Sequence, residues 1–158
     1  MSTDRIVFID PGKHDISIAV FQGGYFITAE FFRGGSCAKH RRVLAYSPDI
    51  VVCEKPQVYQ GAKNTKDANP ADLIDLAVSV GACMSAAPRA YSVAPNHWKG
   101  QVPKNIHHER YEPRLTPAMR SCINVVAPGL QHNVRDAICM GLWWFDTHPL
   151  GSLGYEAQ

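Results

Sequence analysis

Three acidic residues stand where a carboxylate is costly unless it has a partner. Asp10 follows an apolar run, Glu54 ends the run IVVCE at 50–54, and Asp136 precedes Ala-Ile in a segment with helical periodicity. A carboxylate at the boundary of a core must be paired, hydrogen-bonded or bound to a metal ion. Three converging carboxylates repel one another, and a divalent cation relieves that repulsion. Oxygen ligands suit Mg²⁺, and two such ions about 4 Å apart would serve phosphodiester hydrolysis.

Each acid also has an ordinary interpretation. Asp10 stands before a Pro-Gly pair and could cap a turn. Glu54 could pair with Lys55 or with a nearby arginine, and Asp136 could pair with Arg135. We favour the metal site because it accounts for all three acids together.

The elements that must position these acids are predicted from hydrophobic periodicity and turn residues. The Gly23-Gly24 pair predicts a hairpin, Asn69 is a plausible N-cap, and Pro70 suits the first position of a helix. The predicted strands are 5–9, 16–22, 25–32, 50–54 and 90–95, and the predicted helices are 37–46, 70–87, 116–126 and 132–145. A long loop containing Pro, Lys and His is predicted after the fifth strand. The order βββαβαβαα predicts an α/β protein whose mixed five-stranded sheet carries helices on both faces.

This order brings two of the acids to one edge. If strands 5–9 and 50–54 are parallel neighbours, Asp10 and Glu54 emerge at the same end of the sheet, where ligands bind in such folds.

The composition favours a single intracellular domain. The chain has 158 residues, of which 46% are hydrophobic and 19% charged, as in ordinary globular proteins. No apolar run approaches the ~20 residues that cross a bilayer, and the first residues do not resemble a signal peptide, so no membrane is expected. The five cysteines are widely spaced and form no CxxC, which argues against a disulfide framework or a zinc ribbon.

The net charge is only +2, but the basic residues are clustered. One group covers 39–42, a second contains Lys63 and Lys66, and a third runs from Lys99 to Arg114. Such groups are often solvated faces, yet three of them on a nearly neutral chain could form a phosphate-binding surface.

Four stretches together resemble the RuvC family of Holliday junction resolvases, within the ribonuclease H-like superfamily. These are FIDPG at 8–12, VVCE at 51–54, QVYQGAKN at 57–64 and RDAICMG at 135–141. The resemblance spans nearly the whole chain. It implies one RuvC-like nuclease domain over 1–148 with a ribonuclease H-like fold, followed by a short tail over 149–158. The loops are shorter and the motifs differ from the bacterial pattern, which slightly favours a bacteriophage member of the family.

The resemblance implies that Asp10, Glu54 and Asp136 are catalytic metal ligands. The family places a fourth ligand, Asp or His, three residues before the last acid, where this chain has Asn133. His132 lies one residue further back, and either position shares a helix face with Asp136. We expect His132 to be the fourth catalytic ligand, because an imidazole can bind metal or relay a proton whereas Asn133 suits a helix N-cap. A solvent-exposed His132 at a helix start is the alternative.

The resemblance also implies DNA contacts. Tyr59 matches an aromatic residue that stacks on an unpaired base, and Lys63, Lys99 and Lys104 would hold phosphates. Tyr59 could instead pack its loop onto the sheet, and the lysines could simply be solvated. The three tryptophans are expected to be packing residues.

The expected function is therefore that of a metal-dependent, structure-selective endonuclease. It would resolve four-way junctions by paired symmetric nicks, with water attacking the phosphodiester to leave 5′-phosphate and 3′-hydroxyl ends. Two Mg²⁺ ions per site are expected, with Mn²⁺ as a substitute, together with a homodimer and a cytoplasmic location in a bacterium or an infected host. The alternatives are a ribonuclease H-like nuclease for RNA/DNA hybrids or other branched DNA, and a non-catalytic junction-binding module. A sugar kinase would need a longer chain than this one.

Overall fold

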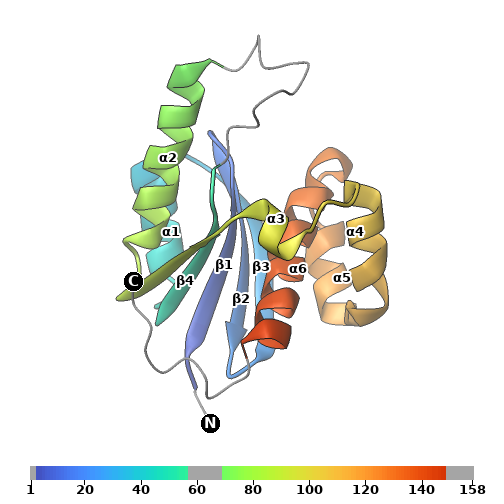
Figure 1. Ribbon diagram of the computed structural model, residues 1–158. Coiled ribbons are helices and arrows are strands. Elements are labelled where there is room, and N and C mark those ends of the chain that lie inside the picture. Colours follow the sequence, from blue (N-terminus) through green and yellow to red (C-terminus); the bar gives the residue numbers. More distant parts are fainter. Residues whose placement is uncertain (1–2, 57–68, 149–158) are drawn as a thin grey trace.

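One mixed sheet separates two layers of helices in the computed structural model, which describes residues 3–56 and 69–148 (Figure 1). The strands are β1 (Arg5–Pro11), β2 (Asp15–Gln22), β3 (Tyr25–Arg33), β4 (Ile50–Glu54) and β5 (Arg89–Val93). Their order across the sheet is β3-β2-β1-β4-β5. The pairs β1/β2 and β2/β3 are antiparallel, whereas β1/β4 and β4/β5 are parallel. The predicted mixed sheet is therefore confirmed.

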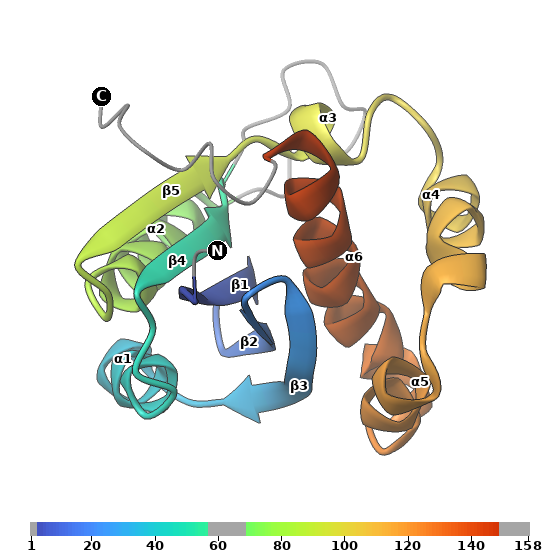
Figure 2. The same cartoon turned by 90° about the horizontal axis from the view of Figure 1, so that it is seen from below.

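The helices are α1 (Ser36–Leu44), α2 (Pro70–Met84), α3 (Pro95–Trp98), α4 (Lys104–Tyr111), α5 (Pro117–Asn124) and α6 (Gln131–Thr147). Two 3₁₀ turns, η2 (Glu112–Arg114) and η3 (Pro128–Leu130), flank α5. Figure 2 shows α1 and α2 on one side of the sheet and α4, α5 and α6 on the other. Within residues 3–56 and 69–148, no helix is long and apolar enough to cross a membrane.

Alternation along β1 gives each helical layer its own core. Successive side chains of a strand point to opposite faces. Ile6 and Phe8 accordingly belong to the cluster that includes the buried residues of α6, and Val7 and Ile9 belong to the cluster under α1 and α2. All four side chains are almost completely buried. β1 is thus a central strand covered on both faces, as its continuous apolar sequence predicts.

The start of α2 agrees with the prediction. The Asn69 side chain accepts a hydrogen bond from the Ala71 N–H at 3.0 Å, and Pro70 occupies the first helical position. The side-chain oxygen satisfies a backbone donor that the first helical turn leaves free.

One member of the basic group at 39–42 does not lie on the surface. Lys39 is fully buried, and its ammonium donates to the carbonyls of Gly12 and Lys13 at 2.8 and 2.9 Å and to the Ser79 hydroxyl at 2.8 Å. These bonds satisfy the buried charge and hold the turn that follows Asp10 against α1 and α2.

The prediction of a long loop after β5 is wrong. That segment forms α3, α4 and η2. Pro95 begins α3, but α4 buries only His107, so it has no apolar stripe from which a helix could be predicted. His107 instead packs against the rings of Trp98 and Tyr111, with centroid distances of 4.9 and 5.2 Å.

All five cysteines are free, as expected. The predicted tail over 149–158 lies outside the described residues, and so do Tyr59 and Lys63.

Candidate active site

The alternation of β1 and β4 directs two carboxylates toward the same helical layer. Asp10 has the same parity along β1 as Phe8, and Glu54 has the same parity along β4 as Val52. Phe8 and Val52 both belong to the cluster on the α6 side of the sheet. Because β1 and β4 are parallel neighbours, Asp10 and Glu54 lie at the same end of this face.

Helix α6 brings the third carboxylate to this end. Asp136 lies among buried residues of α6, and only 2% of its side chain is exposed. The charges of Asp136 and Glu54 both act on Asp10. The structure therefore brings together the three acids that the sequence predicts to converge.

Three cationic or polar side chains from the α3–α4 segment reach these carboxylates. The Lys99 ammonium lies 2.9 Å from Glu54 Oε2 and 3.3 Å from Asp136 Oδ2. Lys104 lies 3.1 Å from Asp136 Oδ2, and His108 Nε2 lies 2.6 Å from Asp136 Oδ1. Lys99 and Lys104 were predicted to hold DNA phosphates, whereas here they neutralise acids of the site.

Trp98 is a packing residue, as predicted, and it also contacts the site. Its indole Nε1 donates a hydrogen bond to Glu54 Oε2 at 2.9 Å, while its ring is buried in the core. The Lys99 ammonium lies over the same ring at 4.5 Å from the centroid, a cation–π contact. Trp98 thereby orients both Glu54 and Lys99.

The environments of Asp10 and Asp136 move their pKa values in opposite directions. Burial and the charges of Asp136 and Glu54 raise the pKa of Asp10 to about 8, against the opposing effect of Lys99 and Lys104. Burial also acts to raise the pKa of Asp136, but the His108 hydrogen bond and the two lysines outweigh it and lower that pKa to about 2. Asp10 is thus the acid whose negative charge remains poorly compensated.

The donor atoms are of the kind that a hard divalent cation prefers, although their arrangement here is closed by a lysine. Three carboxylates supply oxygen ligands, and the charge on Asp10 needs a further positive partner. Ser17 lies opposite Asp10 in the β1/β2 register, and its buried hydroxyl has no hydrogen-bond partner within the described chain. Across 3–56 and 69–148, no three His, Cys, Asp or Glu side chains stand close enough together to hold an ion. Lys99 occupies the space between Glu54 and Asp136 instead.

The fourth predicted ligand, His132, lies on α6 one turn before Asp136 and is exposed to solvent. Partial burial of the ring and the charge of Lys104 lower the pKa of His132, while the charge of Asp136 acts in the opposite direction. His132 therefore interacts electrostatically with two residues of the site. The N-cap role suggested for Asn133 is wrong, because α6 begins at Gln131 with Leu130 as its cap. His132 and Asn133 both remain candidates.

The ordinary interpretations of the three acids do not describe this arrangement. Asp10 lies within β1, and the following turn is closed by the Gly12 N–H donating to the Asp15 carbonyl at 2.8 Å. Glu54 pairs with Lys99. Arg135 pairs with Glu112 at 2.8 Å, whereas Asp136 has the partners already described.

Sequence reasoning missed His108 as a contact of Asp136. The residue was visible only as a member of the third basic group. Its contact depends on α4, which the sequence did not predict.

Solved structures resemble this arrangement of elements, although no protein-family model matches the chain. A search of curated proteins also finds no match. RuvC of T. thermophilus in complex with a Holliday junction substrate aligns with a TM-score of 0.58 and 17% identity, over 94% of this chain and 97% of that one. The fold is that of the RuvC resolvases.

Two further structures share this RuvC fold. Another Thermus thermophilus RuvC structure aligns with a TM-score of 0.55 and 16% identity, over 90% of this chain and 96% of that one. The yeast mitochondrial Holliday junction resolvase Ydc2 aligns with a TM-score of 0.56 and 9% identity, over 90% of this chain and 78% of that one. The predicted ribonuclease H-like architecture, with the resemblance on which it rested, is therefore confirmed at the level of the fold.

Proposed function

We propose that this protein is a metal-dependent endonuclease that resolves four-way DNA junctions. The observation that carries the proposal is the convergence of Asp10, Glu54 and Asp136 at one end of a RuvC-like sheet, with Asp10 left poorly compensated. Carboxylates at a DNA-binding surface would hinder binding unless they held cations. A non-catalytic binding module therefore has no use for this cluster.

Asp10, Glu54 and Asp136 would hold the metal ions, with His132 as the proposed fourth ligand. When bound, a pair of Mg²⁺ or Mn²⁺ ions would activate the attacking water and stabilise the leaving oxygen. The products would be 5′-phosphate and 3′-hydroxyl ends. His108 would keep Asp136 ionised and oriented through its 2.6 Å contact.

Lys99 and Lys104 have a role on the DNA side of the site. Their ammonium groups lie among the carboxylates and carry the positive charge that an approaching phosphodiester meets first. We propose that both lysines exchange these carboxylates for DNA phosphates in the complex. Tyr59 and Lys63 are proposed to contribute a stacked base and a further phosphate contact.

A homodimer would supply the two active sites that paired symmetric nicks require. The described surface offers an apolar stripe along α2, formed by Leu73, Ile74, Ala77, Val78 and Gly81. Ile74 is 63% exposed and Val78 56% exposed. These positions recur every three or four residues, so they share one side of the helix. We propose that this stripe packs against the same stripe of a second copy.

The test uses purified protein on a synthetic four-way junction, a matched linear duplex and an RNA/DNA hybrid, with Mg²⁺ or Mn²⁺. We expect paired nicks on the junction only. Asp10→Asn should abolish or strongly lower cleavage, because it removes one of the three carboxylates that are proposed to hold the metal ions. Junction binding in a gel-shift assay should be retained by the variant.

Other outcomes would redirect the proposal. Cleavage of the RNA/DNA hybrid in place of the junction would keep the active site and change the substrate. Absence of cleavage on all three substrates, with equal junction binding by both proteins, would reduce the chain to a binding module.

A further inference from the structure

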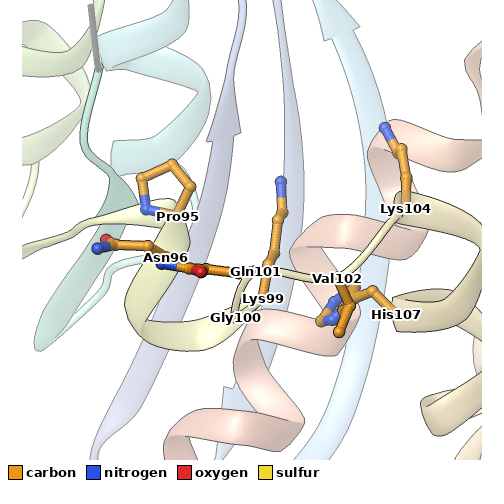
Figure 3. A pocket seen from close by; sticks show the side chains of 8 residues that line it. All are labelled: Pro95, Asn96, Lys99, Gly100, Gln101, Val102, Lys104 and His107. Carbon is orange, nitrogen blue, oxygen red and sulfur yellow. The ribbon is translucent and has the colours of Figure 1, made fainter. Parts of the chain in front are cut away.

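A pocket of about 470 Å³ lies on the α3–α4 segment beside the carboxylates. Lys99 and Lys104, which contact Glu54 and Asp136, also line this pocket. Figure 3 shows their side chains extending toward the same side of the pocket, Lys99 from the end of α3 and Lys104 from the start of α4. Its size lies within the range of pockets that hold small organic ligands. Anything bound in it would therefore touch the proposed active site on one side.

The remaining lining combines hydrogen-bonding groups with apolar walls. Asn96 and Gln101 contribute primary amides, which both donate and accept hydrogen bonds. His107 lines the pocket too, and its buried Nε2 has no hydrogen-bond partner in the described parts of the chain. Its ring packs between Trp98 and Tyr111 and so forms part of the pocket wall.

Gly100, which lines the pocket, has a backbone conformation that favours glycine. Gly100 has a φ of +70°, a left-handed conformation that side chains other than glycine adopt only with strain. A Cβ at this position would meet no atom within 4 Å. The glycine is therefore required by the path of the backbone and not by crowding. That path places Gln101 and Lys99 on the same pocket.

We propose that this pocket holds the nucleotide next to the phosphate that is cut, and that Asn96 and Gln101 read its base. The inference rests on the proposed function and names a part of its substrate site. Amide side chains distinguish bases because each base edge presents its own donors and acceptors. Lys99 and Lys104 would hold the phosphate. The α3–α4 segment would then determine at which bases the protein cuts a junction.

The first test measures cutting rates on junctions that differ only in the bases flanking each nick. We expect wild-type protein to prefer one base at one flanking position, and Asn96→Ala and Gln101→Ala to reduce that preference. A reduction of about 5- to 100-fold is expected for an amide that reads a base. Asn105→Ala is the matched control, because Asn105 is an exposed amide on α4 that does not line the pocket. Its base preference should equal that of wild-type protein.

The second test detects the bound base without cleavage. Junctions carrying 2-aminopurine at successive positions are mixed with the Asp10→Asn protein. A base that leaves the stack for the pocket should raise the fluorescence at one position only. Adding Gln101→Ala to Asp10→Asn should abolish this signal, and adding Asn105→Ala should preserve it.

The two measurements separate the pocket from the activity. Junction cleavage with an unchanged base preference in Asn96→Ala and Gln101→Ala, and no position-specific fluorescence, would overturn the pocket and leave the proposed function intact. A fluorescence signal that depends on Gln101, without cleavage by wild-type protein, would support the pocket and overturn the nuclease. Absence of both junction binding and cleavage would overturn both.

Discussion

At the scale of single residues, Asp10 is the acid of the site whose negative charge is poorly compensated. Its pKa is raised to about 8 from an ordinary value of 3.8. A carboxyl group of this kind binds its proton more tightly in the folded than in the unfolded protein. The free energy of unfolding therefore falls as pH rises between the two pKa values. The stability that protonated Asp10 allows is fully present below about pH 4. It is lost as the pH rises to about 8.

Asp10→Asn should consequently stabilise the metal-free protein, and more so at higher pH. This stabilisation can grow by at most about 1.4 kcal/mol for each unit by which the pH rises. Coupling to Asp136, Glu54 and Lys99 spreads the proton over several groups and reduces the effect. We expect a gain of about 1–3 kcal/mol at pH 7.5 and a smaller gain at pH 5, measured by urea unfolding in EDTA. An equal gain at both pH values would contradict the raised pKa.

Lys99 acts as an internal counter-ion for Glu54 and Asp136. Lys99→Gln leaves both carboxylates without this partner, and the metal-free protein should lose about 1–3 kcal/mol of unfolding free energy. Because the ammonium no longer competes for the acids, added Mn²⁺ should raise the thermal midpoint of this variant more than that of wild-type protein.

Lys55→Gln provides the control for this comparison, since Lys55 is an exposed neighbour of Glu54. It should change neither the stability in EDTA nor the Mn²⁺ response. If Lys99→Gln gave the same Mn²⁺ shift as wild-type protein, the lysine would not compete with a cation.

At the scale of elements, the packing of α6 against the sheet determines the position of Asp136. Gly141 allows this close approach, because a Cβ there would overlap the Phe21 ring of β2, with the ring Cζ at only 2.9 Å. Phe21 is itself enclosed by Phe8, Phe26 and Phe145 and has little room to move. Helix α6 must therefore shift to accept a side chain at position 141.

Gly141→Ala should destabilise the protein by about 1–3 kcal/mol through overpacking. It should also lower the junction-cutting rate, because the helix that carries Asp136 moves. Gly129→Ala is the control, since no atom lies within 4 Å of a Cβ at that glycine. Both effects are read from urea unfolding and single-turnover cleavage. A Gly141→Ala protein as stable as Gly129→Ala would contradict the tight contact with Phe21.

At the scale of the whole molecule, the apolar stripe on α2 is expected to join two copies. Ile74→Glu places a charge in the middle of the stripe. Sedimentation equilibrium should report a dimer for wild-type protein and a monomer for this variant. On a junction, the monomer should produce single nicks in place of paired ones. Val125→Glu is the matched control, because Val125 is 81% exposed but lies at the end of α5. A dimeric Ile74→Glu protein would place the interface elsewhere.

Much of this architecture could be predicted from local patterns. The continuous apolar sequence of β1, the glycine pair of the hairpin and the Asn69–Pro70 helix start each act within a few residues. Their combination predicted the sheet and the end of it at which Asp10 and Glu54 emerge. The parity of residues along a strand is a property of the strand itself and is readable before folding.

The partners of these carboxylates were decided only by the tertiary structure. Trp98 meets Glu54 across 44 positions of sequence, and His108 meets Asp136 across 28. Helix α4, which supplies His108, has no apolar periodicity, because His107 is its one buried residue. Its position follows from packing against Trp98 and Tyr111, which no local propensity encodes. The sequence by itself therefore determined which acids would meet, and only the tertiary structure decided which cations and aromatic groups would surround them.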